Sequence, residues 1–123
     1  MYRLPCKSFG QNFLQDVHLC ARIAEMATSP PGGKVVEIGA GLGALTRPLL
    51  ERASSVVAVE RDRDLVPILR QELSAFTHLE IVEADAARLD YEALFRGASR
   101  PRVLVGNLPY QISGKLLRRA VEL

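Results

Sequence analysis

The most constraining feature of this sequence is a short apolar run followed directly by a glycine-rich turn. Residues 35–38 are apolar apart from one glutamate, and Gly39-Ala40-Gly41-Leu42-Gly43 comes next, ahead of a helical pattern at 44–52. A strand, a glycine-rich turn and a helix in this order place backbone N–H groups and a helix N-terminus beside a ligand. Gly39 and Gly41 permit close approach because they lack Cβ and can take positive φ. The pattern predicts a ligand site at the carboxyl end of this strand.

Strand and helix patterns alternate along the rest of the chain. We expect strands at 35–38, 56–59, 79–82 and 103–105, and helices at 16–27, 44–52, 64–73 and 91–95, with a last helix from about Ser113. Asp16 is expected to cap the first of these helices, and Asp64 is expected to open the third. Alternating elements predict a parallel sheet with right-handed crossovers, and continuous apolar strands predict helices on both faces. The predicted fold class is α/β, doubly wound.

Composition limits the function classes further. The 123 residues, 48% hydrophobic, fit one small domain with a real core, and a net charge of +2 does not prove a nucleic-acid partner. Cys6 and Cys20 are too few and too far apart for a metal site, so we expect reduced thiols and no metal. No segment has the roughly 20 apolar residues of a membrane span. A cytoplasmic protein without a membrane partner is expected.

Two acidic residues follow the next two predicted strands. Glu60 lies 21 residues after Gly39, at the end of the second strand, where a carboxylate can accept both hydroxyls of a ribose. Asp85 follows the third strand and can accept a hydrogen bond from the amine of an adenine. Asp85 could instead simply cap a short helix at 86–87. Both carboxylates are predicted to lie at the edge of the sheet that carries the glycine turn.

Such a loop suits either a dinucleotide or S-adenosylmethionine. The dinucleotide fingerprint has a third glycine where this chain has Ala44, but alanine is permitted there, so the loop alone does not decide. Glu37, just before Gly39, would repel a pyrophosphate, whereas it can approach the cationic end of S-adenosylmethionine. The methyl donor is therefore favoured over the dinucleotide. A tight turn without a ligand is a third interpretation.

The fourth predicted strand leads into Asn107-Leu108-Pro109-Tyr110 at the same edge of the sheet. The Asn107 side-chain carbonyl and the Leu108 main-chain carbonyl could accept hydrogen bonds from an aromatic amine and favour a more tetrahedral nitrogen. Pro109 stiffens the turn, and Tyr110 offers a ring on which a flipped-out base can stack. Asn-x-Pro is also common in plain turns. Because residues 107–110 follow a strand that ends beside the glycine turn, a catalytic role is favoured over a plain turn.

Five spaced motifs together resemble the KsgA/RsmA family of small-subunit ribosomal RNA adenine dimethyltransferases. They are KSFGQNFL at 7–14, EIGAGLG at 37–43, VE at 59–60 with Asp62, DA at 85–86 and NLPY at 107–110. The resemblance spans nearly the whole chain. The erythromycin-resistance methyltransferases are relatives of this family, and the GQNFL form together with Leu108 favours the KsgA branch.

The resemblance implies a Rossmann-like S-adenosylmethionine-dependent methyltransferase fold and a role for each matched residue. Asn12 and Leu14 would close over the cofactor, Gly39 would lie against its methionine part, and Asn107 would lie beside the methyl donor and the target amine. The implied reaction adds two methyl groups to each of two adjacent adenosines in small-subunit ribosomal RNA, within an assembling 30S-type particle. A monomer is expected for the full-length protein.

The resemblance also predicts that this chain is the front part of a longer protein. We expect residues 1–15 to be a lead with the cofactor-closing motif and 16–123 to be a partial methyltransferase domain, truncated after the fourth strand. Family members continue with further strands and a helical domain that helps to hold RNA. Basic residues in the second half could contact phosphates or simply face solvent: Arg96, Arg100, Arg102, Lys115, Arg118 and Arg119.

Two other functions stay open on the sequence. One is a non-catalytic RNA-binding or ribosome-assembly module of the same fold, which need not bind S-adenosylmethionine. The other is a dinucleotide oxidoreductase, which Glu37 and residues 107–110 argue against. Cofactor titration separates all three.

Overall fold

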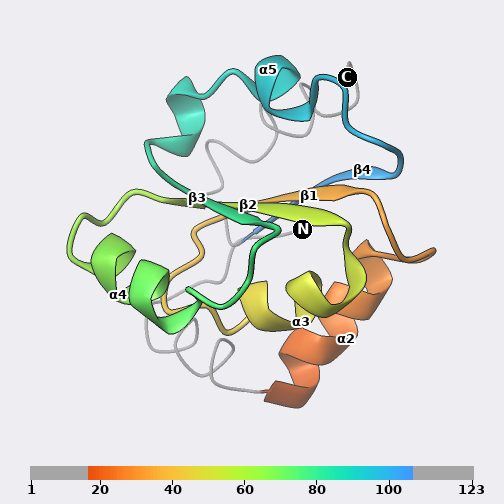
Figure 1. Cartoon of the computed structure of the whole chain (residues 1–123), viewed down its shortest axis with the longest axis horizontal. Coiled ribbons are helices and arrows are strands. Elements are labelled where there is room, and N and C mark those ends of the chain that lie inside the picture. Colours follow the sequence, from red (N-terminus) through yellow and green to blue (C-terminus); the bar gives the residue numbers. More distant parts are fainter. Residues whose placement is uncertain (1–16, 107–123) are drawn as a thin grey trace.

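Residues 17–106, the part of the chain that the computed structural model describes, form a parallel sheet with helices on both faces (Figure 1). The strand order is β3-β2-β1-β4, and each neighbouring pair is parallel. The predicted α/β class with a parallel sheet is therefore confirmed. In chain order the elements are α2 (Val17–Ala27), β1 (Lys34–Ile38), α3 (Thr46–Arg52), β2 (Ser55–Glu60), α4 (Leu65–Glu72), β3 (Leu79–Glu83), the 3₁₀ helix η1 (Ala86–Arg88), α5 (Tyr91–Phe95) and β4 (Arg102–Gly106).

One face of the sheet is covered by α2, α3 and α4 (Figure 1). Val35 of β1 and Val56 of β2 pack there with Leu49 of α3 and with Cys20 and Ala24 of α2. Cys20 and Ala24 form a buried stripe on α2, since residues four apart lie on one side of a helix. Helix α2 thus buries its apolar side against the sheet and α3.

The opposite face is covered by α5 and the segment before it (Figure 1). Val36 and Val57 are the strand neighbours of the residues that face α3, and successive strand side chains point to opposite faces. They pack with Tyr91 and Phe95, both buried. Coverage of both faces explains why the strands are nearly continuous apolar runs.

One helix start differs from the sequence prediction and another agrees with it. Helix α3 begins at Thr46 rather than 44, because Gly43 donates its N–H to the carbonyl of Ala40 and prolongs the turn. Helix α4 does begin directly after Asp64, as predicted, although the Asp64 side chain makes no capping hydrogen bond. The turn before α4 is held by Asp62, whose Oδ1 accepts from the Asp64 N–H at 2.8 Å, as short acidic side chains do in turns. Asp16 lies outside the described residues.

The strand order places a topological switch point between β1 and β4. The chain moves from β1 outward to β2 and β3, then returns to the other side of β1 for β4. Ligands of open α/β sheets bind outside the carboxyl ends of strands at such a point. Gly106, the last described residue of β4, pairs with Ile38, and a Cβ at 106 would lie 2.3 Å from the Ile38 carbonyl oxygen. Only glycine therefore allows β4 to end this close to β1.

Within residues 17–106 no helix combines the length and the apolar character needed to cross a membrane.

Candidate cofactor-binding site

The glycine turn folds back over the end of β2. Gly39 and Gly41 have φ of 76° and 60°, the positive values that the sequence predicted. The N–H groups of Gly39 and Ala40 both donate to the carbonyl of Val59, at 2.8 and 3.2 Å. These two hydrogen bonds hold the glycine turn at the end of β2, next to Glu60.

Glu60 connects this turn to the loop after β2. Its Oε1 accepts from the Gly41 N–H at 2.7 Å and its Oε2 from the Asp62 N–H at 2.9 Å, and the residue is 8% exposed. An ionised carboxylate offers about four lone-pair positions, so each oxygen keeps one for a further donor. Two vicinal ribose hydroxyls are donors that match this remaining capacity.

The hydrogen bonds inside the turn disfavour a pyrophosphate. Dinucleotide loops present free backbone N–H groups to the phosphates. Here the N–H groups of Gly39, Ala40, Gly41 and Gly43 all donate within the protein, to Val59, Glu60 and Ala40. The loop therefore offers glycine backbone at Gly39 and Gly41 next to carboxylates, which suits a cofactor without phosphates.

Glu37 is the second acidic residue at this edge, and it is almost fully buried, with 2% exposure. The Thr46 hydroxyl, at the start of α3, donates to Glu37 Oε1 at 2.5 Å. Burial raises the pKa of Glu37 to about 7, while the Thr46 hydrogen bond lowers the pKa and the negative charge of Glu60 raises it. Glu37 thus ties the strand before the turn to the helix after it, and it has a proton to exchange near neutral pH.

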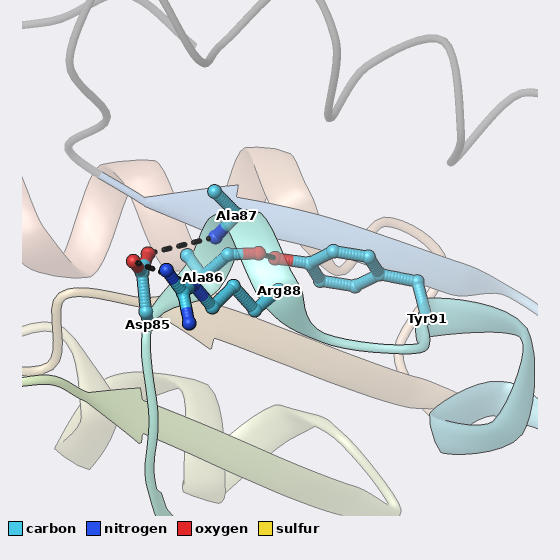
Figure 2. Close-up of polar contacts among 5 residues, drawn as sticks. All are labelled: Asp85, Ala86, Ala87, Arg88 and Tyr91. Atoms are coloured by element: carbon cyan, nitrogen blue, oxygen red, sulfur yellow. Dashed lines mark hydrogen bonds and ion pairs between the residues drawn. The ribbon is translucent and has the colours of Figure 1, made fainter.

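Asp85 lies two residues after β3, close to the backbone of Glu60. Ala84 donates its N–H to the Glu60 carbonyl at 3.1 Å, which fixes the end of β3 against the end of β2. Asp85 Oδ1 accepts from the Ala87 N–H at 3.0 Å and caps η1, as one of the two sequence interpretations expected (Figure 2). Its Oδ2 is 3.9 Å from Arg88 Nε, which is too long for a hydrogen bond. The cap therefore leaves acceptor capacity on a side chain that is 36% exposed.

The structure brings together all five predicted cofactor residues that it describes, at the carboxyl ends of β1, β2 and β3: Glu37, Gly39, Gly41, Glu60 and Asp85. Asn12, Leu14 and the motif Asn107, Leu108, Pro109 and Tyr110 lie outside the described residues. Sequence reasoning missed Thr46 as the partner of Glu37. A hydroxyl residue in the first turn of the helix after the loop was the available signal.

The arginines between α5 and β4 lie at the other, amino-terminal edge of the sheet. Arg96 and Arg100 are exposed, and Arg102 donates from Nε and one terminal nitrogen to the Ala98 carbonyl, at 3.2 and 3.1 Å. Arg102 therefore fastens its own loop. Contact of this group with phosphates stays a prediction. Over the described range, no three His, Cys, Asp or Glu side chains gather in a way that could hold a metal ion.

A parallel sheet with this strand order, a glycine turn after β1 and acidic residues after β2 and β3 define a Rossmann-like methyltransferase fold of the S-adenosylmethionine-dependent class. The comparison with protein families identifies the particular one. The model of the ribosomal RNA adenine dimethylase family matches residues 5–123, and the chain belongs to this family.

Individual relatives agree with this assignment. The chain is 48% identical over 113 residues to the ribosomal RNA small subunit methyltransferase A of Magnetococcus marinus, covering 92% of this chain and 40% of that protein. The crystal structure of the 23S rRNA methyltransferase ErmE is similar with a TM-score of 0.71 and 37% identity, over 87% of this chain and 41% of that one. The crystal structure of the N-terminal domain of EvdMO1 with SAH bound is similar in fold only, with a TM-score of 0.57 and 25% identity over 65% of this chain and 34% of that one. The chain thus spans about two fifths of the length of its curated relative.

Proposed function

We propose that this protein binds S-adenosylmethionine at the carboxyl edge of its sheet and transfers methyl groups to the exocyclic amines of two adjacent adenosines in small-subunit ribosomal RNA. The observation that best supports this cofactor is the hydrogen bonding of Glu60. Its carboxylate accepts from the N–H groups of Gly41 and Asp62, in two different loops, and keeps acceptor capacity for the hydroxyls of a ribose. The family supports adenine in ribosomal RNA, and the name of the 48% identical relative supports the small subunit.

Each residue of the site has a task in holding the cofactor. Glu60 accepts the ribose hydroxyls, and Asp85 accepts from the adenine amine. Gly39 and Gly41 let the methionine part approach the backbone, and Glu37 offers a negative charge to the cationic end. Residues 1–15 form a lead that closes over the cofactor through Asn12 and Leu14. The bound cofactor supplies a methyl group already activated by its sulfonium, so positioning dominates the catalysis.

The acceptor side of the reaction belongs to Asn107, Leu108, Pro109 and Tyr110. The carbonyls of Asn107 and Leu108 accept from the target amine and draw its lone pair out of conjugation with the ring, while Tyr110 stacks on the base. The pairing of Gly106 with Ile38 supports this proposal, because the motif follows a strand that ends at the switch point. We propose that the full-length protein acts as a monomer in the cytoplasm, on an assembling small subunit.

Methyl transfer tests the proposed function directly. The remainder of the Magnetococcus relative is fused after Leu123 and assayed with labelled S-adenosylmethionine on small subunits that lack the modification. We expect label in dimethyladenosine, and we expect Asn107→Ala to lower the rate by at least about a hundredfold because the target amine loses an acceptor made in the transition state. Much weaker turnover is expected of the 123 residues alone. Retained methylation in Asn107→Ala would refute its role, and cofactor-independent RNA binding without methylation would favour an assembly module.

Gly41→Ala tests where the cofactor lies. A Cβ on Gly41 meets no atom within 4 Å, but its φ of +60° makes an alanine strained by about 1–2 kcal/mol. Gly97, on the amino-terminal edge, is a matched control, because it has φ of +75° and the same open surroundings. Both variants should lose similar stability in thermal unfolding.

Only Gly41→Ala should weaken S-adenosylmethionine binding in calorimetry, by about tenfold or more, because its methyl group would occupy space against the ligand. Equal affinities in the two variants would place the cofactor away from Gly41.

A further inference from the structure

Tyr91 is a buried residue next to the candidate site whose hydroxyl is directed at the turn after β3. The residue is 1% exposed, and its ring packs in the cluster that covers the α5 face of the sheet. Its hydroxyl donates to the carbonyl of Ala86 at 2.5 Å (Figure 2). A phenylalanine ring could fill the same space, so the hydroxyl contributes this hydrogen bond in addition to the packing of the ring.

The carbonyl that Tyr91 holds belongs to the residue directly after Asp85. Ala86 is the first residue of η1. In this short helix the Ala87 N–H donates to Asp85 Oδ1 at 3.0 Å, and the Arg88 N–H donates to the Asp85 carbonyl at 2.9 Å. The acceptor in each of these three hydrogen bonds is therefore an oxygen of Asp85 or of Ala86. Ala86 also packs against the core cluster, and the Tyr91 hydroxyl adds to this packing a hydrogen bond with a defined direction.

Without that bond the turn has weak support on its outer side. The Arg88 side chain is 87% exposed and 3.9 Å from Asp85 Oδ2, a separation at which an exposed ion pair contributes little. A buried ring, by contrast, has one well-defined position, and its hydroxyl transmits that position to Ala86. The Ala86 carbonyl and the Ala87 N–H belong to one planar peptide group, so the Tyr91 hydroxyl and Asp85 Oδ1 bond to the two ends of the same rigid unit.

Asp85 lies where a base-specific contact is expected under the proposed function. Its chain neighbour Ala84 is hydrogen-bonded to the backbone of Glu60, so the carboxylates assigned to ribose and to adenine belong to one connected unit. A hydrogen bond that distinguishes an amino group from an oxo group depends on the direction of the acceptor as well as its presence. Whatever sets the direction of the Asp85 carboxylate therefore also sets how well the site distinguishes adenine from a base with an oxo group.

We propose that Tyr91 is a positioning residue for adenine recognition: through Ala86 its hydroxyl sets the direction in which Asp85 accepts from the 6-amino group of the cofactor. This inference rests on the proposed cofactor site. It assigns a specificity role to a core residue that does not touch the ligand.

The test compares S-adenosylhomocysteine with S-inosylhomocysteine, in which an oxo group replaces the 6-amino group, by calorimetry on the 123-residue chain and its variants. Wild type should prefer the adenine ligand, and Asp85→Ala should lose roughly tenfold of that preference, as expected for one charge-assisted hydrogen bond. Tyr91→Phe keeps the ring and should lose roughly fivefold of the preference, a part of the same hydrogen bond.

Phe95→Leu is the control for a purely structural effect. Phe95 is 1% exposed in the same cluster, so this change should lower the melting temperature while the adenine preference stays at the wild-type value. An unchanged preference in Tyr91→Phe, with Asp85→Ala still impaired, would overturn the inference and leave the proposed site intact. A wild-type protein that binds neither ligand, or an Asp85→Ala variant with full preference, would overturn the proposed site and the inference with it.

Discussion

Glu60→Ala should weaken S-adenosylmethionine binding by about a hundredfold or more. Two ribose hydroxyls lose a charged acceptor, and each such hydrogen bond contributes about 1.5–3 kcal/mol, so the pair exceeds the roughly 2.8 kcal/mol of a hundredfold change. The N–H groups of Gly41 and Asp62 lose their acceptor as well. Calorimetric titration of the chain and the variant measures the difference.

Glu83→Ala is the matched control for this experiment. Glu83 pairs with Glu60 across β2 and β3 and is exposed, so its removal takes the same charge from the same edge of the sheet without breaking a described loop contact. Its affinity for S-adenosylmethionine should stay near the wild-type value. NADH should bind none of the three proteins. An unchanged dissociation constant in Glu60→Ala would refute the assignment, and NADH binding would support a dinucleotide enzyme.

A second ligand separates contact with the ribose from support of the glycine turn. With the 2′-deoxy analogue of S-adenosylhomocysteine, wild type should lose affinity because one hydroxyl is missing, whereas Glu60→Ala should lose almost nothing further. Such non-additivity marks two groups in direct contact. Equal losses in both proteins would mean that Glu60 acts only by holding the turn through Gly41.

The arrangement of the sheet was predictable because its signals are local and repeated. Largely apolar runs of three or four residues, each followed by a turn and a helical pattern, predicted every described strand to within one residue at either end. Parallel strands bring their carboxyl ends to one edge, so the positions of Glu60 and Asp85 followed from the order of elements alone. The predicted meeting of the glycine turn, Glu60 and Asp85 was correct for this reason.

Side-chain partners were less predictable, since several groups compete for each donor. Asp64 and Asp62 are both acidic residues near the start of α4, and only the three-dimensional turn decides that Asp62 receives the N–H. Glu37 illustrates the same limit. Its charge suggested contact with a cation, but nothing in the sequence indicated that Thr46 would share it or that the carboxyl would be buried.

The buried position of Glu37 leads to a pH-dependent stability. Burial raises its pKa from 4.5 to about 7, so the folded state holds a proton that the unfolded chain has released between these values. The free energy of unfolding should therefore fall as pH rises from about 4.5 to 7, and the full penalty of about 3 kcal/mol should persist above pH 7.

Glu37→Gln should remove this penalty. A glutamine still offers an oxygen to the Thr46 hydroxyl but carries no charge to desolvate. At pH 8 the variant should be more stable than wild type by up to about 3 kcal/mol, and the two should converge below pH 4.5. Urea unfolding of both proteins from pH 4.5 to 8.5 measures the difference, which cancels the titration of all other groups. Parallel stability curves would contradict the burial of an ionisable group here.

Glu37→Gln should stabilise the free protein but weaken its binding of a cationic ligand above pH 7. A sulfonium near Glu37 favours the ionised form, so the affinity of wild type for S-adenosylmethionine should rise with pH up to a plateau above pH 7. S-adenosylhomocysteine has the same ribose, adenine and amino acid but no sulfonium charge, and its affinity should depend less on pH. Glu37→Gln should bind both ligands with the same, flatter pH profile. If wild type shows one profile for the two ligands, Glu37 does not respond to the sulfonium, and its role is confined to joining β1 to α3 through Thr46.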